Sequence, residues 1–275
     1  MGLVAVDGAK CARDGICVAE CPMKVIELKE GAAVPTVVDG AEARCIKCGH
    51  CVAACPHSAF ALEGMPPEAL QPVRKEWALD RERTEHFLRA RRSIRAFRGK
   101  KVGRETLASL LDVARYAPTG ANSQQVKWLV INSPEGVQRI AGHIAELMRH
   151  LVAEKHPVAA QYQLDRRVAA WDAGDRSILR QAPCLVIAHA PAAYPLAQVD
   201  CAIALSYLEL AAPSFGLGTC WAGSLTIPLV EWSPLRTELG LPEGHTWFGA
   251  LMVGHPKYAY HRIPSRNKAS VVWRD

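Results

Sequence analysis

The 275-residue sequence lacks the features that would place it in a membrane or a secretory pathway. Residues 1–20 contain no apolar core typical of a signal peptide, because Asp7, Asp14 and Glu20 interrupt them. No apolar run approaches the roughly 18 residues that a membrane-spanning helix needs. With 49% hydrophobic and 22% charged residues, the composition is that of a globular protein. We therefore expect a cytoplasmic protein without a membrane partner.

Acidic residues are scarce in one part of the chain. Residues 1–64 carry six basic and eight acidic side chains, whereas the remainder carries 27 basic and 19 acidic ones. Eight of the basic residues lie in 89–104, which contains no acid. Such a run is typical of a solvated face, a nucleic-acid patch or a phosphate site. No aromatic platform or nucleic-acid fold accompanies it, so the pattern favours phosphate binding and argues against a nucleic-acid partner.

Cysteine is concentrated at the start of the chain. Seven of the ten cysteines lie between residues 11 and 55, whereas Cys184, Cys201 and Cys220 are scattered and fit packing positions. Without a secretory signal, a cluster of thiols indicates metal binding rather than disulfides.

The cysteine-rich region is an internal repeat of 34 residues. A shift by that length superimposes Cys11, Cys17 and Cys21 on Cys45, Cys51 and Cys55. It also places Asp14 on Cys48. The second copy, CIKCGHCVAACP, is a complete C-x2-C-x2-C-x3-C-P run, and the first departs from it only at Asp14 among the ligand positions.

Residues 3–64 resemble the bacterial two-cluster ferredoxins. In that family three cysteines of one loop bind one cluster, and the fourth cysteine ligates the other cluster. The resemblance implies one [4Fe–4S] site formed by Cys21, Cys45, Cys48 and Cys51, and a second site formed by Cys11, Asp14, Cys17 and Cys55. Zinc is the alternative, since paired C-x2-C units also bind it, but the repeated x3-C-P pattern fits zinc poorly.

Asp14 leaves the state of the first site open. A carboxylate binds iron less tightly than a thiolate does. The site is therefore predicted to hold either an Asp-ligated [4Fe–4S] cluster or a [3Fe–4S] cluster, with an empty site as the alternative. Either cluster should differ in reduction potential from its neighbour.

The remaining sequence predicts a linker and a second domain. Pro66, Pro67 and Pro72 indicate a stiff connection, which gives an iron–sulfur domain at 1–64, a linker at 65–79 and a second domain at 80–275. Apolar periodicity predicts helices at 104–116, 134–152, 160–171 and 196–216, and strands at 126–131, 184–190 and 247–254. Helices packed on few strands indicate an α+β or mixed α/β domain.

Four segments of the second domain, in order, carry a further resemblance: RRSIRAF (91–97), APTGANSQ (117–124), GLGTCWAG (216–223) and VGHPKYAYHRIPSR (253–266). Together they resemble the flavin-binding nitroreductases, from about residue 80 to the end. The resemblance implies an α+β fold with a mixed sheet flanked by helices, FMN as cofactor, and a homodimer. The acceptor pocket would be lined by segments such as 143–180.

The resemblance also implies the FMN contacts. Arginine forks suit phosphate and ring oxygens, and glycines permit close backbone approach. The implied cofactor-binding residues are Arg91, Arg92, Ser93, Arg95, Pro118, Thr119, Gly120, Asn122, Gln124, Cys220, Trp221, Ala222, Gly223 and Arg266. Some relatives carry an acid at the position of Ala222, so no side-chain proton donor or catalytic residue is assigned.

Together the two halves predict an FMN-dependent oxidoreductase. Electrons would pass from iron–sulfur clusters to FMN and on to an organic acceptor such as a nitroaromatic or a quinone. The alternatives are an NAD(P)H-dependent nitro- or quinone reductase with accessory clusters, and an electron carrier or redox sensor without turnover. No G-x-G-x-x-G fingerprint occurs, but the family binds nicotinamide without one, so a redox protein and NAD(P)H both remain candidate donors.

Overall fold

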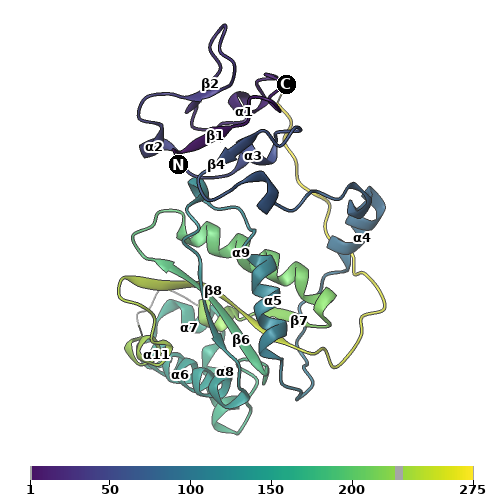
Figure 1. Cartoon of the computed structure of the whole chain (residues 1–275). Coiled ribbons are helices and arrows are strands. Elements are labelled where there is room, and N and C mark those ends of the chain that lie inside the picture. Colours follow the sequence, from purple (N-terminus) through teal and green to yellow (C-terminus); the bar gives the residue numbers. More distant parts are fainter. Residues whose placement is uncertain (1, 227–231, 275) are drawn as a thin grey trace. The chain divides into compact units, whose positions relative to one another are not determined.

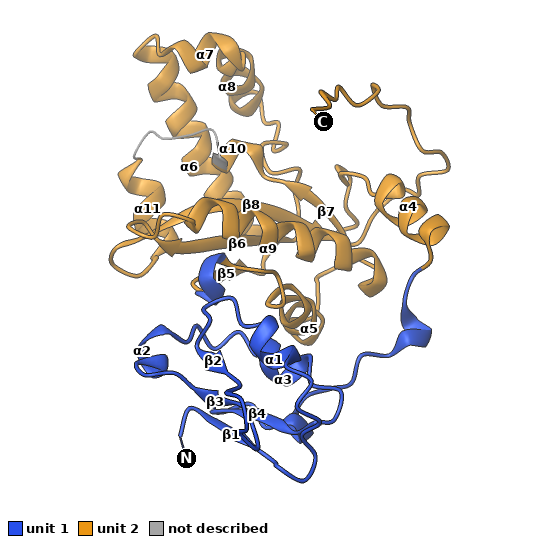
Figure 2. Cartoon of the chain, turned by 90° about the horizontal axis from the view of Figure 1, so that it is seen from above, with its two compact units in different colours: residues 1–79, 120–123 blue, residues 80–119, 124–275 orange. Residues whose placement is uncertain are grey.

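The computed structural model describes residues 2–226 and 232–274. The chain forms two compact units (Figure 2), of which the first comprises Met1–Leu79 with Gly120–Ser123 and the second Asp80–Thr119 with Gln124–Asp275. The stretch predicted as a linker contains two short 3-10 turns, Pro67–Ala69 (η1) and Lys75–Trp77 (η2). The predicted boundary at residue 64 stays a prediction.

The first unit consists of two small antiparallel sheets and three single-turn helices (Figure 1). Its elements are β1 (Val4–Val6), α1 (Ile16–Ala19), β2 (Ile26–Glu27), β3 (Thr36–Val37), α2 (Ala41–Arg44), α3 (His50–Ala53) and β4 (Phe60–Leu62). β1 pairs with β4, and β2 with β3. Helices α1 and α3 lie 34 residues apart, so the sequence repeat is also a structural repeat.

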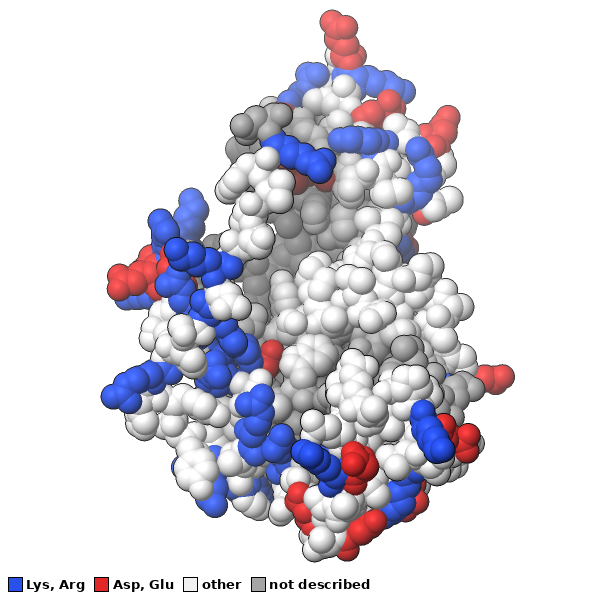
Figure 3. Space-filling model, turned by 180° about the vertical axis from the view of Figure 1, so that it is seen from behind, with Lys and Arg blue, Asp and Glu red and all other residues white. Residues whose placement is uncertain are grey.

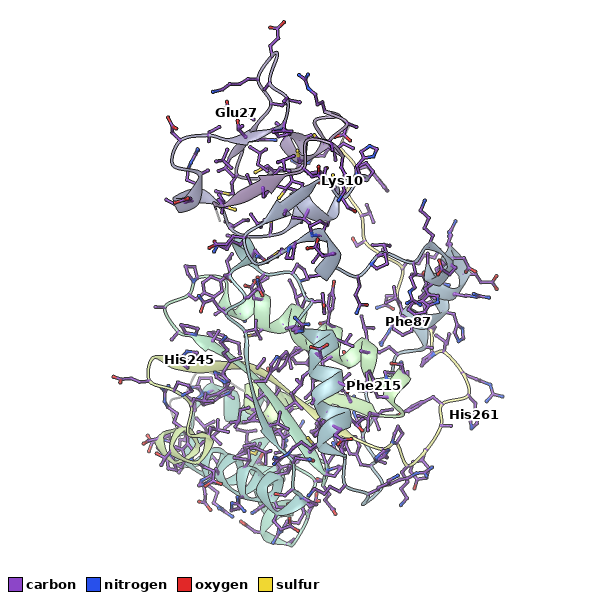
Figure 4. The ribbon with its side chains drawn as sticks, in the orientation of Figure 1. Lys10, Glu27, Phe87, Phe215, His245 and His261 are labelled. Atoms are coloured by element: carbon purple, nitrogen blue, oxygen red, sulfur yellow. The ribbon has the colours of Figure 1, made fainter. Side chains whose placement is uncertain are left out.

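The second unit is built on one four-stranded sheet, in the order β5-β6-β8-β7. Its elements are α4 (Arg81–Ala90), α5 (Arg104–Ala114), β5 (Lys127–Ile131), α6 (Pro134–Ala153), α7 (Pro157–Gln161), α8 (Leu164–Asp172), β6 (Cys184–Pro191), α9 (Ala197–Ala211), η4 (Ala212–Phe215), β7 (Gly218–Trp221), α10 (Gly223–Thr226), α11 (Ser233–Leu239) and β8 (His245–Gly254). A further turn, η3 (Gly120–Asn122), is part of the first unit, whereas Thr119 before it and Gln124 after it belong to the second. Figure 4 labels His245, where β8 begins, and Phe215, which ends η4.

The sheet of the second unit lies between two helical layers. Side chains alternate along β6: Val186 and Ala188 pack with α5 and α9, whereas Leu185 and Ile187 pack with α6. Both faces of β6 are buried. The strand predicted at 184–190 is confirmed, and it lies in the interior of the sheet.

Two expectations need correction. The predicted mixed sheet is wrong for the described strands, because all three pairings are antiparallel. Strands separated by helices suggest parallel crossovers, but the excursion through α6, α7 and α8 returns the chain in the opposite direction. The helix predicted at 160–171 begins only at Leu164, because Gln163 has a left-handed backbone (φ 50°) that separates α7 from α8.

Local sequence explains where the longer helices begin. The Ser133 hydroxyl accepts a hydrogen bond from Gly136 N–H at 3.0 Å, and Pro134 occupies the first turn of α6. Asp80 caps α4 in the same way through Arg83 N–H at 2.8 Å. Within the described residues, no helix combines the length and apolar character needed to cross a bilayer.

Candidate functional site

Two cavities in the first unit separate the predicted metal ligands into two groups of four. One is lined by Cys21, Cys45, Cys48 and Cys51, among other residues. The other is lined by Cys11, Asp14, Cys17 and Cys55. Each group thus takes one cysteine from the opposite repeat, which is the crossed arrangement expected for two clusters. Across residues 2–226 and 232–274, no three Cys, His, Asp or Glu side chains lie close enough together to bind a single metal ion.

The two ligand loops share an unusual backbone. Left-handed φ angles recur at positions 34 residues apart: Arg13 and Lys47, Gly15 and Gly49, and Lys24 and Ser58. For the four non-glycine residues this conformation costs on the order of 1 kcal/mol each, so it persists only where the surroundings impose it. The loop that contains Asp14 therefore keeps the conformation of the complete C-x2-C-x2-C loop.

Hydrogen bonds to sulfur also follow the repeat. The backbone N–H of Val25 donates to Cys21 Sγ at 3.4 Å, and that of Ala59 donates to Cys55 Sγ at 3.3 Å. Such bonds favour the charged form of a thiolate ligand and influence the reduction potential of a bound cluster.

Burial keeps two of these thiols protonated when no metal is bound. It raises the pKa of Cys51 to about 11, and it raises the pKa of Cys17 as well. Metal binding at these positions must therefore release protons. The donor sets fit iron–sulfur clusters in number, chemistry and arrangement.

Asp14 stands in the ligand register of the first loop with its carboxylate exposed. Its Oδ1 accepts a hydrogen bond from Ile16 N–H at 3.1 Å, which fixes the side chain at the start of α1. The carboxylate lines the same cavity as Cys11, Cys17 and Cys55. An oxygen donor is thus present at the position where the second loop has Cys48.

Asn122 contacts the second ligand loop. The segment Gly120–Ser123 belongs to the first unit, and there Asn122 Nδ2 donates to the carbonyls of Ile46 at 3.0 Å and Lys47 at 3.1 Å. Both carbonyls lie between Cys45 and Cys48. The predicted contact of Asn122 with a flavin ring stays a prediction.

In the second unit, the chain that follows α4 runs beside β7. Ile94 N–H donates to the Thr219 carbonyl at 2.8 Å, and Arg98 N–H donates to the His255 carbonyl at 2.9 Å. Gly218 makes this approach possible, since a Cβ there would meet the Ile94 side chain and, at 2.9 Å, Pro256 Cγ. The pairing brings into contact residues that are 125 positions (Ile94 and Thr219) and 157 positions (Arg98 and His255) apart in sequence.

These two segments form one wall of a cavity of about 850 Å³. Five of the residues expected to contact FMN line it together: Arg95, Cys220, Trp221, Ala222 and Gly223. The volume lies within the ~300–1,000 Å³ typical of small-molecule pockets. Burial raises the pKa of Cys220, so this thiol is not a reactive thiolate. The donor set and the cavity size fit a flavin mononucleotide.

The rest of the lining contains functional candidates that no motif identified. Its residues come from α8 and the segments on either side of it: Tyr162, Arg166, Arg167, Ala170, Trp171, Asp175, Ser177, Ile178 and Arg180. The sequence predicts that segments such as 143–180 line an acceptor pocket, but it does not single out these residues. Their convergence depends on how α7 and α8 fold back, and residue spacing does not reveal it.

Arg91 and Arg92 line a second hollow of the same unit rather than the large cavity. Arg91 Nη1 lies 2.9 Å from Glu209 Oε1, and Trp221 Nε1 donates to Glu209 Oε2 at 3.3 Å. The buried Glu209 therefore fastens the arginine segment to the Trp221 loop.

Arg92 has unused hydrogen-bonding capacity. Its Nε is buried without a partner in the described structure, while its guanidinium lies 5.8 Å from the centre of the Tyr260 ring. A buried unsatisfied donor is costly, and an anionic group would satisfy it. Figure 3 shows Lys and Arg side chains gathered over the side of the second unit that carries α4 (Phe87 is labelled there in Figure 4).

The other predicted contacts lie outside both cavities. Gln124 N–H donates to Thr119 Oγ1 at 3.0 Å, and Ala121, Asn122 and Gln124 all have left-handed φ angles, a form of strain often found at binding sites. Pro118 precedes this turn, and Arg266 is exposed in the C-terminal segment.

Comparison with known proteins gives matches to both halves. Residues 88–255 match the model of the nitroreductase family, and residues 9–60 match a 4Fe-4S dicluster domain. A Methanothermobacter thermautotrophicus protein with the provisional name NADH dehydrogenase/NAD(P)H nitroreductase is 27% identical over 170 residues, which are 62% of this chain and 75% of the relative.

Two solved structures are similar in fold. A nitroreductase with bound FMN from Bacteroides fragilis superimposes with a TM-score of 0.55 and 24% identity, covering 70% of this chain and 98% of the other. A nitroreductase with bound FMN from Desulfitobacterium hafniense gives 0.53 and 24%, covering 69% and 97%.

Proposed function

The chain belongs to the nitroreductase family and carries an N-terminal 4Fe-4S dicluster domain, and we propose that it passes electrons from two iron–sulfur clusters through FMN to a small organic acceptor such as a nitroaromatic or a quinone. One observation carries the proposal: donor sets for two clusters line two cavities of the first unit, and a flavin-sized cavity lies in the second. When bound, the clusters supply single electrons and FMN accepts one or two.

In this proposal the cysteine loops bind iron and set the potentials. Cys21, Cys45, Cys48 and Cys51 hold a [4Fe–4S] cluster, and Cys11, Cys17 and Cys55 hold the other with Asp14. The N–H groups of Val25 and Ala59, which donate to one thiolate of each set, stabilise negative charge on the clusters.

The FMN-binding residues are proposed to divide by chemistry. Arg91, Arg92, Ser93 and Arg266 bind phosphate, and the unsatisfied Nε of Arg92 supports that role. Arg95, with Gln124 and Asn122, contacts ring oxygens and nitrogens, over the turn of Pro118, Thr119 and Gly120. Backbone groups of 220–223 approach the ring. The bound FMN in the Bacteroides fragilis structure supports the choice of cofactor.

We also expect a homodimer. The second unit exposes Val199 and Tyr207 on α9, Val113 on α5, and Val272 and Trp273 in the C-terminal segment. Val272 and Trp273 are each 84% exposed, which is unusual for side chains of this size unless a partner covers them. Light scattering of the FMN-loaded protein should give twice the chain mass, and a stable flavin-loaded monomer would contradict the dimer.

The test is anaerobic reduction of the cofactor-loaded protein. It is mixed separately with NADH, NADPH and a reduced low-potential ferredoxin, and flavin absorbance is followed. We expect the ferredoxin to bleach the flavin, and a nitroaromatic or quinone to restore its colour. If only NADH or NADPH bleached the flavin, the result would support the alternative, a reductase that takes electrons directly from NAD(P)H. The name of the Methanothermobacter relative is the argument for that alternative. Bleaching without reoxidation by any organic acceptor would favour an electron carrier.

The state of the site that contains Asp14 is tested by electron paramagnetic resonance of the same cofactor-loaded protein. We expect two cluster signals in electron paramagnetic resonance, of which one arises from a [3Fe–4S] cluster in the oxidised protein or from an Asp-ligated [4Fe–4S] cluster with its own potential. The retained loop conformation around Asp14 supports an occupied site. Iron sufficient for one cubane, with a single cluster signal, would contradict it.

A further inference from the structure

The large cavity of the second unit is strongly basic on the wall formed by α8 and the segments on either side of it. Arg166 and Arg167 extend from α8, Arg180 comes from the segment that follows it, and Asp175 is the acidic residue of the lining. Asp175 is engaged by its own turn, since its two carboxylate oxygens accept from Ser177 N–H at 2.8 Å and Ser177 Oγ at 2.7 Å. The arginines are thus left without a matching carboxylate.

The contacts of these arginines are neutral. Arg167 Nη2 donates to Ser224 Oγ at 2.8 Å, and Arg166 Nη1 donates to Gln163 Oε1 at 3.2 Å. Within the described ranges, no Asp or Glu lies at ion-pair distance from Arg166, Arg167 or Arg180. Burial, and then the charge of Arg180, lower the pKa of Arg167. Among the described residues, no carboxylate offsets the cost of holding that cation.

The backbone holds Arg180 in this lining at a cost. Arg180 and Gln181 have consecutive left-handed φ angles of 55° and 49°. Leu179 and Ala182 on either side of them are fully buried, which fixes the turn. Strain of this kind is typical of ligand-binding positions.

Aromatic and apolar side chains lie beside the cations. Trp171 and Tyr162 belong to the same wall, and Ile178, Met252 and Ala222 complete an apolar surface. The Arg176 guanidinium stacks on the Trp171 ring at 4.5 Å and restrains it. The cavity thus offers a planar apolar surface next to paired guanidinium groups.

We propose that this wall binds a planar aromatic carboxylate, and that the acceptor of the enzyme belongs to this class. Guanidinium groups bind carboxylates through two parallel hydrogen bonds, and the aromatic ring of the ligand packs against Trp171 and the apolar residues. That this ligand is the electron acceptor rests on the proposed function, whereas its chemical class rests on the cavity alone. The phosphate of FMN is the competing anion, and Arg91, Arg92 and Ser93 are already assigned to it.

The test compares ligands of one shape and different charge. Benzoate and benzamide are titrated into the FMN-loaded protein by calorimetry, and KM is measured for 4-nitrobenzoate and 4-nitrobenzamide. Reduction of either nitro group to nitroso consumes two electrons and two protons, releases one water and leaves the carboxylate or amide unchanged. We expect benzoate to bind at least about 10-fold more tightly, since a hydrogen bond to a charged group contributes ~1.5–3 kcal/mol.

Arginine variants locate the effect. Arg180→Gln and Arg167→Gln should each remove most of the preference for benzoate and leave benzamide binding unchanged, whereas Arg180→Lys should keep part of it. Arg139→Gln is the matched control, because Arg139 lies on α6 and pairs with Glu238 at 3.0 Å, outside the cavity. That variant should keep the full preference.

Two results would overturn the inference. One is equal affinity for benzoate and benzamide in the wild-type protein. The other is loss of FMN affinity in Arg180→Gln and Arg167→Gln with an unchanged preference for benzoate, which would assign these arginines to the flavin phosphate. Failure of the proposed function is a separate outcome, because a protein that prefers benzoate but reduces no acceptor keeps the ligand site and loses the enzymatic role.

Discussion

Replacing Cys48 by serine is expected to stop the reduction of the flavin by a reduced ferredoxin. Cys48 lies in the cavity with Cys21, Cys45 and Cys51, and serine removes one of four thiolates from the proposed [4Fe–4S] site. Loss of even an outer partner of a metal ligand costs ~10–100-fold in affinity or activity, so loss of a ligand should slow reduction at least about 100-fold. Stopped-flow absorbance measures the rate, and iron content measures the cluster.

Cys48→Asp is the matched variant, because the first loop has Asp14 at the same register with the same backbone. It should retain more iron than Cys48→Ser and show a cluster of altered potential. In both variants, bleaching of the flavin by dithionite should be unaffected, which shows that the second unit is intact. Full iron content and an unchanged rate in Cys48→Ser would exclude Cys48 as a ligand on the electron route.

The candidate ligands of the metal sites could be predicted from the sequence, because ligand residues recur at fixed, short spacings along the chain. The 34-residue shift identifies the eight candidate donors, the resemblance to two-cluster ferredoxins implies their division into two groups of four, and the structure places each group around one cavity. The sequence also predicts a strand at 184–190 from its β-branched residues, and the structure has β6 there. In each case the signal lies in short stretches of sequence: the spacing of ligand residues within each loop, and the composition of a single strand.

Contacts between distant segments were not predictable in the same way. Arg167 and Arg180 meet Ser224 and Cys220 only because α7 and α8 fold back over the sheet. Glu209 lies in the last turn of α9, and no motif predicts its contacts with Arg91 and Trp221. The antiparallel pairing of the sheet likewise depends on long connections. Residue patterns do not show in which direction the chain returns after such a connection.

Replacing Gly218 by alanine should destabilise the second unit and weaken FMN binding together. An added Cβ would overlap the Ile94 side chain, with Ile94 Cβ at 3.0 Å and Pro256 Cγ at 2.9 Å. Ile94 is buried and its N–H is bonded to Thr219, so neither segment yields without breaking that pairing. Overpacking of this kind costs ~1–3 kcal/mol of unfolding free energy. Thermal and denaturant unfolding of the apoprotein measure it.

The loss of FMN affinity follows from geometry. Ile94 lies between Ser93 and Arg95, so displacement of Ile94 moves both away from Cys220, with which Arg95 lines the cavity. A single charge-assisted hydrogen bond is worth ~1.5–3 kcal/mol, so we expect at least about a 10-fold rise in the dissociation constant of FMN. Fluorescence titration of the apoprotein with FMN measures that change.

Two further variants separate this effect from a general loss of stability. Gly142→Ala on α6 meets no heavy atom within 4 Å, and it should stabilise the protein slightly because alanine favours the helix by ~0.5–1 kcal/mol. Ile94→Ala in the Gly218→Ala background removes most of the overlap. The double variant should therefore be less destabilised than the sum of the single ones by ~0.5–3 kcal/mol. Strict additivity would mean that Gly218 does not act through Ile94, and the positions of Ser93 and Arg95 would then need another cause.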